Sequence, residues 1–169
     1  QASSSAASDV YKRQAAEAQA TPPIREFLKS KAVWAILVAH FCNNWTLYVI
    51  LSWLPKYVNE GLGVPFGDIG YIAMLPHITS FLCLNVAGNI ADRMIVSGMS
   101  VTKVRKIMQT IAFGGLAICL FLVTTVDTVW AAIGILCLGK LFGAAGIGGH
   151  SVNHMDVAPR HAGTLMGIT

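Results

Sequence analysis

Charged residues are scarce in this sequence. Asp, Glu, Lys and Arg make up 12% of the 169 residues, whereas hydrophobic residues make up 54%. A soluble domain carries about 25% charged residues, so this composition excludes an ordinary soluble protein and predicts an integral membrane protein. The basic excess lies in short links between apolar runs, which is typical of cytoplasmic loops and gives no support to nucleic-acid binding.

Cysteine is also rare, and no metal-binding pattern is present. Cys42, Cys83, Cys119 and Cys137 each lie in a different apolar run. No pair has the spacing of a disulfide framework or of a metal site, so we interpret them as buried small apolar side chains. We expect no metal, no organic cofactor and no catalytic residue.

Four apolar stretches reach the length of about 20 residues that a helix needs to cross a bilayer. They lie near 32–57, 68–91, 106–126 and 129–150. Basic residues occur in alternate links: Arg25, Lys29 and Lys31; then Arg93, Lys103, Arg105 and Lys106; then Arg160. The sequence therefore predicts an all-α membrane protein with four transmembrane helices whose basic links are cytoplasmic.

The two ends of the chain differ from its middle. Residues 1–14 are low in complexity, and we interpret them as a non-native artefact. Residues 15–31 are expected to form a cytoplasmic linker, residues 32–150 the four-helix part, and residues 151–169 a cytoplasmic loop and the start of another helix. Because a new apolar run begins at the last residues, we expect a fragment of a longer chain.

Two motifs lie in the predicted cytoplasmic links. GNIADRMIVSGMSVTKVRK, residues 88–106, joins the second span to the third, and NHMDVAPRHAG, residues 153–163, follows the fourth. Together with HFCNNW, SWLPKY and VTKVRKIMQ, they resemble the anion:cation symporter branch of the major facilitator superfamily over about residues 23–169. This branch holds sialin, the vesicular glutamate transporters and the plant plastid-type phosphate transporters.

The resemblance implies a fold and a function. The spans would be helices seven to ten of twelve, in the C-terminal half, with the N-terminal six-helix half of the same chain as partner. The expected function is secondary active transport of a small anion by alternating access, most simply inorganic phosphate coupled to Na⁺ or H⁺. An organic anion such as sialate, a carboxylate, glutamate or ascorbate is the alternative. Plastid, vesicular or lysosomal, and plasma membranes all stay open.

Polar side chains within the apolar spans form the candidate substrate site. His40, Asn44 and Tyr48 recur every four residues and so share one helix face. Lys140 is charged near mid-span, where insertion costs about 2.5–3.5 kcal/mol. Alternatively, these groups only hydrogen-bond between helices. The full candidate set is His40, Asn43, Asn44, Tyr48, His77, Lys140 and Asn153.

Charged residues of the two motifs form a candidate cytoplasmic gate. We predict that Asp92 pairs with Arg105 or Lys106 across the link, and that Asp156 and Arg160 exchange partners such as Arg105 during transport. The gating set is Asp92, Arg93, Arg105, Lys106, Asp156 and Arg160.

Two other classes of protein compete with a transporter. A membrane enzyme would use histidines as ligands or bases, but the nearest pair, His150 and His154, is expected to straddle a helix end. A non-transporting membrane subunit is the second alternative, since a protein of only four spans would suit that role.

Overall fold

The computed structural model describes residues 24–169, which form helices and contain no strand. The expected artefact and the first part of the linker lie outside these residues. The long helices are α3 (Lys31–Lys56), α4 (Ile69–Val96), α5 (Val101–Leu122) and α6 (Val129–Ala144). Shorter helices are α2 (Ile24–Lys29), α7 (His150–Val157) and α8 (Ala162–Ile168). Single turns are η1 (Tyr57–Gly61), η2 (Phe66–Asp68), η3 (Val123–Thr125), η4 (Ala145–Gly148) and η5 (Pro159–His161).

Four helical segments of the described chain are long and apolar enough to cross a membrane, which confirms the predicted fold class. They are Lys31–Gly61, Phe66–Val96, Val101–Val123 and Val129–Val157. The helices pass beyond several predicted limits, because a helix keeps its backbone hydrogen bonds in water as well as in lipid. Residues 92–96 thus continue α4, and α5 starts at Val101. Residues 151–157, expected as a loop, are helical.

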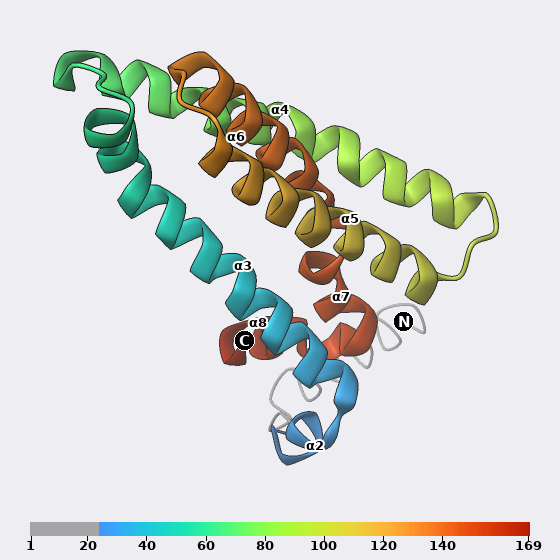
Figure 1. Ribbon diagram of the computed structural model, residues 1–169. Coiled ribbons are helices and arrows are strands. Elements are labelled where there is room, and N and C mark those ends of the chain that lie inside the picture. Colours follow the sequence, from blue (N-terminus) through green and yellow to red (C-terminus); the bar gives the residue numbers. More distant parts are fainter. Residues whose placement is uncertain (1–23) are drawn as a thin grey trace, which may run out of the picture.

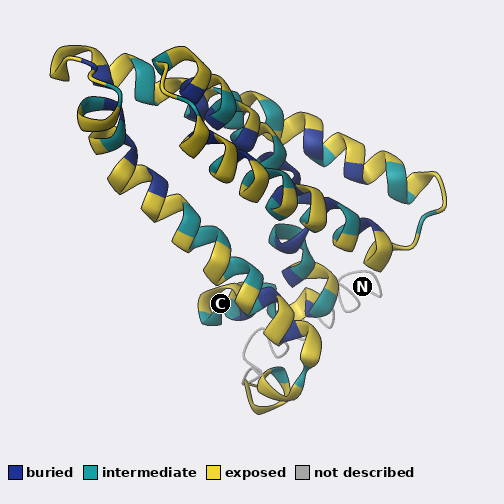
Figure 2. Cartoon of the chain, viewed as in Figure 1, coloured by how far each residue is buried: buried dark blue, intermediate teal, exposed yellow. Residues whose placement is uncertain are grey.

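The second, third and fourth spans pack closely against one another, and the first span, α3, stands apart from them. α6 packs against both α4 and α5, whereas α3 diverges from them in Figure 1. In Figure 2, buried residues are spread along α4, α5 and α6, but on α3 they lie towards its two ends. The middle of α3 exposes large side chains such as Phe41, Trp45 and Tyr48. An aromatic surface of this kind is compatible with lipid or with another membrane helix.

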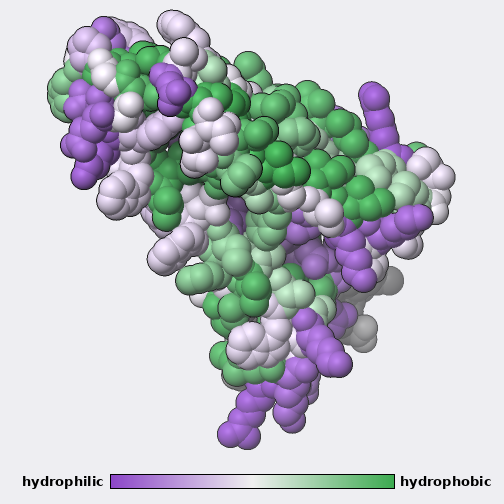
Figure 3. All heavy atoms as spheres, in the orientation of Figure 1, coloured by the Kyte–Doolittle hydropathy of each residue, from purple (hydrophilic) through white to green (hydrophobic). Residues whose placement is uncertain are grey.

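Two apolar clusters hold the ends of α3. At one end, Ile50 and Leu54 pack with residues of η3 and α6 such as Val123 and Ile133. At the other end, Val33 and Ile36 of α3 pack with Ala158 and with Leu165 of α8. This second end also holds α2 and the α4–α5 turn, and Figure 3 shows hydrophilic atoms gathered over both. We call it the basic end; it contains the links that the sequence predicts to be cytoplasmic.

One local expectation from the sequence, that the cysteines are buried, needs correction. Only Cys119 is buried, while Cys83 and Cys137 are half-buried and Cys42 is exposed. A thiol is apolar enough to face lipid, so an apolar run does not require its cysteines to lie in the protein core. Pro76 lies inside α4, which is continuous through it.

Candidate functional site

The fourth span breaks where glycines bring it close to two other helices. α6 ends in η4, and α7 begins at His150 directly after Gly149. A Cβ at Gly148 would lie 2.6 Å from the Cβ of Ala91 on α4. A Cβ at Gly149 would lie 2.5 Å from Oε1 and 3.2 Å from the backbone Cα of Gln109 on α5. The absence of side chains at Gly148 and Gly149 therefore permits the close approach at the break.

Replacing Gly149 with alanine tests this close approach. We expect Gly149→Ala to destabilise the protein by about 1–3 kcal/mol, because the added methyl group overpacks against the backbone of Gln109. The measurement is the thermal unfolding midpoint of the purified protein in detergent. Gly134→Ala is the matched control, since no atom lies within 4 Å of a Cβ at Gly134. Equal midpoints for the two variants would contradict the packing argument.

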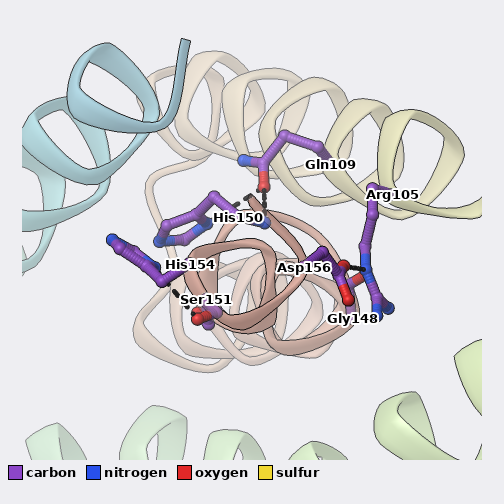
Figure 4. A network of polar contacts seen from close by, with 7 residues as sticks. All are labelled: Arg105, Gln109, Gly148, His150, Ser151, His154 and Asp156. Carbon is purple, nitrogen blue, oxygen red and sulfur yellow. Dashed lines mark hydrogen bonds and ion pairs between the residues drawn. The ribbon is translucent and has the colours of Figure 1, made fainter. Parts of the chain in front are cut away.

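Gln109 holds the first residue after the break. Its Oε1 accepts from the backbone N–H of His150 at 2.9 Å and lies 3.0 Å from Nδ1 of the same residue (Figure 4). A backbone N–H only donates, so the amide oxygen must face it, and His150 Nδ1 must then carry a proton. The other ring nitrogen of His150, Nε2, is left with a lone pair.

Three histidines meet beside the break. The His40 ring centroid lies 5.8 Å from that of His150 and 5.7 Å from that of His154. The Thr169 hydroxyl lies between two of the rings, 3.1 Å from His40 Nδ1 and 2.9 Å from His154 Nε2. His154 Nδ1 donates to the Ser151 carbonyl at 3.1 Å. We call His40, His150 and His154 the histidine cluster.

The placement of these histidines corrects one expectation. His150 and His154 do not straddle a helix end; both are buried on α7, one turn apart. Within residues 24–169, no group of three or more His, Cys, Asp or Glu side chains has a geometry that would hold a metal ion. The cluster is therefore a set of hydrogen-bonded imidazoles in these residues, and it does not resemble a metalloenzyme centre.

Lys140 lines a cavity between α3, α4 and the fourth span. This cavity has a volume of about 200 Å³, and its polar lining residues are Asn43, Thr46, Ser80, Lys140, His150 and Ser151. Lys140 is half-buried and forms no ion pair with any residue from 24 to 169. We call this space the lysine cavity. It combines one unpaired cation with short neutral hydrogen-bonding groups.

A second space, of about 370 Å³, lies between α3 and α5 at the basic end. We call it the basic-end cleft. Arg105 and Asp156 line it, and the Nε of Arg105 donates to Oδ2 of Asp156 at 2.7 Å. The Nη1 of Arg105 also donates to the Gly148 carbonyl at 3.1 Å, beside the helix break (Figure 4). His150 lines both the cleft and the lysine cavity, so it separates the two.

The structure distributes the candidate substrate residues over several places. Asn43 and Lys140 share the lysine cavity, and Asn153 lies in the basic-end cleft. Asn44 and Tyr48 line an apolar groove on another face of α3, with Trp45 and Trp53. His40 belongs to the histidine cluster, and His77 faces the far end of α3 near Leu54 and Pro55. Of the three residues spaced by four on α3, Asn44 and Tyr48 line one groove and His40 does not, while the face towards Lys140 carries Asn43.

The predicted gating residues also separate. Arg105 and Asp156 form the ion pair described above, and Lys106 lines the same cleft. The predicted pairing of Asp92 with Arg105 or Lys106 is wrong, because Arg105 turns towards the break and no described residue forms an ion pair with Asp92. Asp92 and Arg93 are exposed near the end of α4, and Arg160 is exposed on η5.

Sequence reasoning did not select several residues of this region. Gln109 and Thr169 contact the histidine cluster, and Thr46, Ser80 and Ser151 line the lysine cavity. The signal for Gln109 was a polar side chain inside an apolar span, one helical turn beyond Arg105. Serine and threonine carry no comparable signal, because they often bond to their own helix, as Thr46 does to the Cys42 carbonyl.

Comparison with known families now identifies the fold. The sequence profile of the Major Facilitator Superfamily matches residues 3–169. This chain belongs to the Major Facilitator Superfamily. It is an integral, multi-pass membrane protein of a transporter family and not an enzyme, as the sequence predicted.

Three superfamily relatives share similar identity with the chain, each over 87% of it. The Sodium-dependent phosphate transport protein 1, chloroplastic, of Arabidopsis thaliana is 36% identical, and the chain covers 29% of its length. The Ascorbate transporter, chloroplastic, of the same plant is 37% identical, with 27% covered. The Vesicular glutamate transporter 3 of Danio rerio is 40% identical, with 25% covered. These superfamily members are thus several times longer than this chain.

Proposed function

We propose that the full-length protein is a secondary active transporter of a small anion, with inorganic phosphate as the first substrate. The three relatives described above are named for phosphate, ascorbate and glutamate transport, which share the negative charge of the solute. Their identities to this chain, 36%, 37% and 40%, do not discriminate between these solutes. The choice among them therefore depends on the site.

The observation that carries the proposal is the unpaired Lys140 in the lysine cavity. A cation inside a membrane span is costly unless it has a partner, and such residues mark substrate or ion pathways. Asn43, Ser80 and Ser151 offer amide and hydroxyl donors around it. One ammonium group and several short donors suit an oxyanion, whose oxygens each accept hydrogen bonds.

The arrangement of the two spaces supports transport by alternating access. Substrate sites of such transporters lie near the membrane midplane, between two halves that rock against each other. Lys140 is the twelfth residue of the Val129–Val157 segment, close to its middle. The basic-end cleft lies next to the lysine cavity, and the Arg105–Asp156 pair beside it supports a gate on that side. A six-helix N-terminal half would complete the site, with Na⁺ or H⁺ as co-transported ion and no other cofactor.

A non-transporting subunit is less well supported, because such a role gives no reason for a polar cavity around Lys140. The membrane in which the protein works is proposed from its relatives. Two of the three are named chloroplastic and one vesicular, so we propose a plastid envelope or thylakoid membrane first and a vesicular membrane second.

Uptake by the purified full-length protein in proteoliposomes tests the function. We expect accumulation of radiolabelled phosphate when a Na⁺ or a proton gradient is imposed, and competition by unlabelled ascorbate, glutamate or sialate if the site accepts organic anions. Liposomes without protein provide the background. If neither phosphate nor any of the organic anions is taken up or exchanged, the proposal is wrong.

A further inference from the structure

We propose that the histidine cluster is the site of the coupling ion, that this ion is a proton, and that it binds at Nε2 of His150. The inference rests on the proposed anion transport and assigns its driving ion, which the function alone leaves open between Na⁺ and H⁺. It follows from the hydrogen bonds at the helix break, the position of His150 between two cavities, and the charges that surround it.

The hydrogen bonds of His150 leave one nitrogen available. Gln109 Oε1 fixes the proton on Nδ1, as argued above, and no hydrogen bond to Nε2 occurs among residues 24–169. A sodium ion would need several oxygen ligands, whereas imidazole nitrogens predominate here. A proton needs only the lone pair of Nε2: the N–H bond forms as a hydronium ion gives up its proton and becomes water, and the imidazole becomes an imidazolium.

The rest of the cluster offers a short path for that proton. His154 Nδ1 donates to a carbonyl, so neutral His154 accepts at Nε2 from the Thr169 hydroxyl, which in turn accepts from His40 Nδ1–H. When a proton binds at Nε2 of His40, the Nδ1 proton of His40 passes to the Thr169 oxygen as the hydroxyl proton passes to Nε2 of His154. His40 is then neutral with its proton on Nε2, His154 is an imidazolium that donates to Thr169, and the Thr169 hydroxyl donates to His40 Nδ1. His40 ends this path 5.8 Å from His150, measured between ring centroids.

The charges around the cluster link proton binding to anion binding. Lys140 and His150 line the same cavity, and Arg105, Lys106 and Asp156 line the cleft that His150 also borders. α5 contributes Gln109 and Phe113, and α8 is followed by the neutral Thr169. Asp156, the only carboxylate that lines these two spaces in the described chain, is held by Arg105. No free carboxylate therefore stabilises an imidazolium at His150.

A bound anion changes the sign of the local interaction. In the empty cavity, an imidazolium at His150 and the ammonium of Lys140 are two cations that line one space with no anion between them, and like charges repel. An anion between the two cations is attracted to both, so proton and anion each favour the binding of the other. Joint binding and joint release are the requirement for symport. Because His150 separates the lysine cavity from the basic-end cleft, the proton is bound at the position where access changes.

The test compares driven and undriven transport by the full-length protein in proteoliposomes. The first measurement is exchange of labelled for unlabelled phosphate at equal pH on both sides. The second is phosphate accumulation driven by an acidic exterior without Na⁺. We expect wild-type protein to show both activities, and His150→Gln to lose the pH-driven accumulation to a much greater extent than exchange, which reports any effect on the anion site itself. His40→Gln is a second variant with the same expected loss, and His161→Gln, which lies outside the cluster, is the control.

Each alternative result has a defined meaning. Unchanged pH-driven accumulation in both cluster variants overturns the inference. So does equal loss of exchange and accumulation in both, which assigns the cluster to substrate binding or folding. Wild-type accumulation that requires a Na⁺ gradient and ignores the pH gradient also overturns it, while leaving the proposed function intact. Absence of exchange of phosphate and of the organic anions by the wild type contradicts the proposed function itself, and with it this inference.

Discussion

Replacing Lys140 with glutamine is expected to weaken phosphate binding by about 10-fold to 150-fold, because a hydrogen bond to a charged group contributes about 1.5–3 kcal/mol. Glutamine keeps a polar side chain in the cavity but removes its only unpaired cation among the described residues. The effect is measured as the rise in KM for labelled phosphate in exchange by full-length protein. Lys140→Arg preserves the charge and is expected to recover part of the affinity.

Two controls separate this effect from a general change in charge or folding. Lys103→Gln removes one positive charge from an exposed position at the start of α5, outside both cavities, and should leave KM unchanged. The unfolding midpoint of Lys140→Gln should not fall, since burial of an unpaired charge destabilises the wild type. A wild-type KM in Lys140→Gln would mean that the lysine cavity is not the anion site.

Breaking the Arg105–Asp156 pair is expected to impair transport at the basic end of the protein. The side chains of Arg105 and Asp156 are 14% and 33% exposed. The loss of either partner should therefore lower the free energy of unfolding by about 1–3 kcal/mol, after allowance for solvent screening of the more exposed carboxylate. Arg105→Gln should be the more damaging variant, because it also removes the bond to the Gly148 carbonyl at the helix break. Asp156→Asn leaves that bond in place.

The comparison of both variants needs a measure of stability and a measure of transport. Thermal unfolding in detergent gives the first, and phosphate exchange in proteoliposomes gives the second, with Arg105→Gln/Asp156→Asn to isolate the pair interaction. Lys56→Gln and Glu60→Gln provide the matched exposed pair, whose 3.8 Å contact is expected to contribute nothing measurable. If Arg105→Gln behaves like Lys56→Gln, the pair is not part of a gate.

Helix number and class followed from the sequence because each span satisfies its own backbone hydrogen bonds and must be apolar along about 20 residues. Such requirements are local, so composition and the position of basic residues reveal them. The limits of the helices were less predictable. Val96 and Val101 flank a turn of only four residues, since helices continue through the charged membrane interface where the apolar signal has already ended.

The candidate site depended on contacts that periodicity does not encode. Lys140 was identifiable from the sequence because a charge in an apolar span stands out. Which of Asn43 and Asn44 faces Lys140 depends on the rotation of α3 about its own axis. The two apolar clusters at the ends of α3, around Ile36 and Leu54, determine that rotation. A rotation of about 100° per residue moves one amide into the lysine cavity and the next into a different groove.

The sequence by itself thus determined that this is an all-helical membrane protein of the Major Facilitator Superfamily, with polar side chains along α3 and a charge within the fourth span. Only the tertiary structure decided that Arg105 pairs with Asp156 and not with Asp92, and that His40 meets His150 and His154. The physical reason is the glycine-permitted approach of the fourth span to Ala91 and Gln109. That approach places the helix break, and the break orients the side chains that follow it.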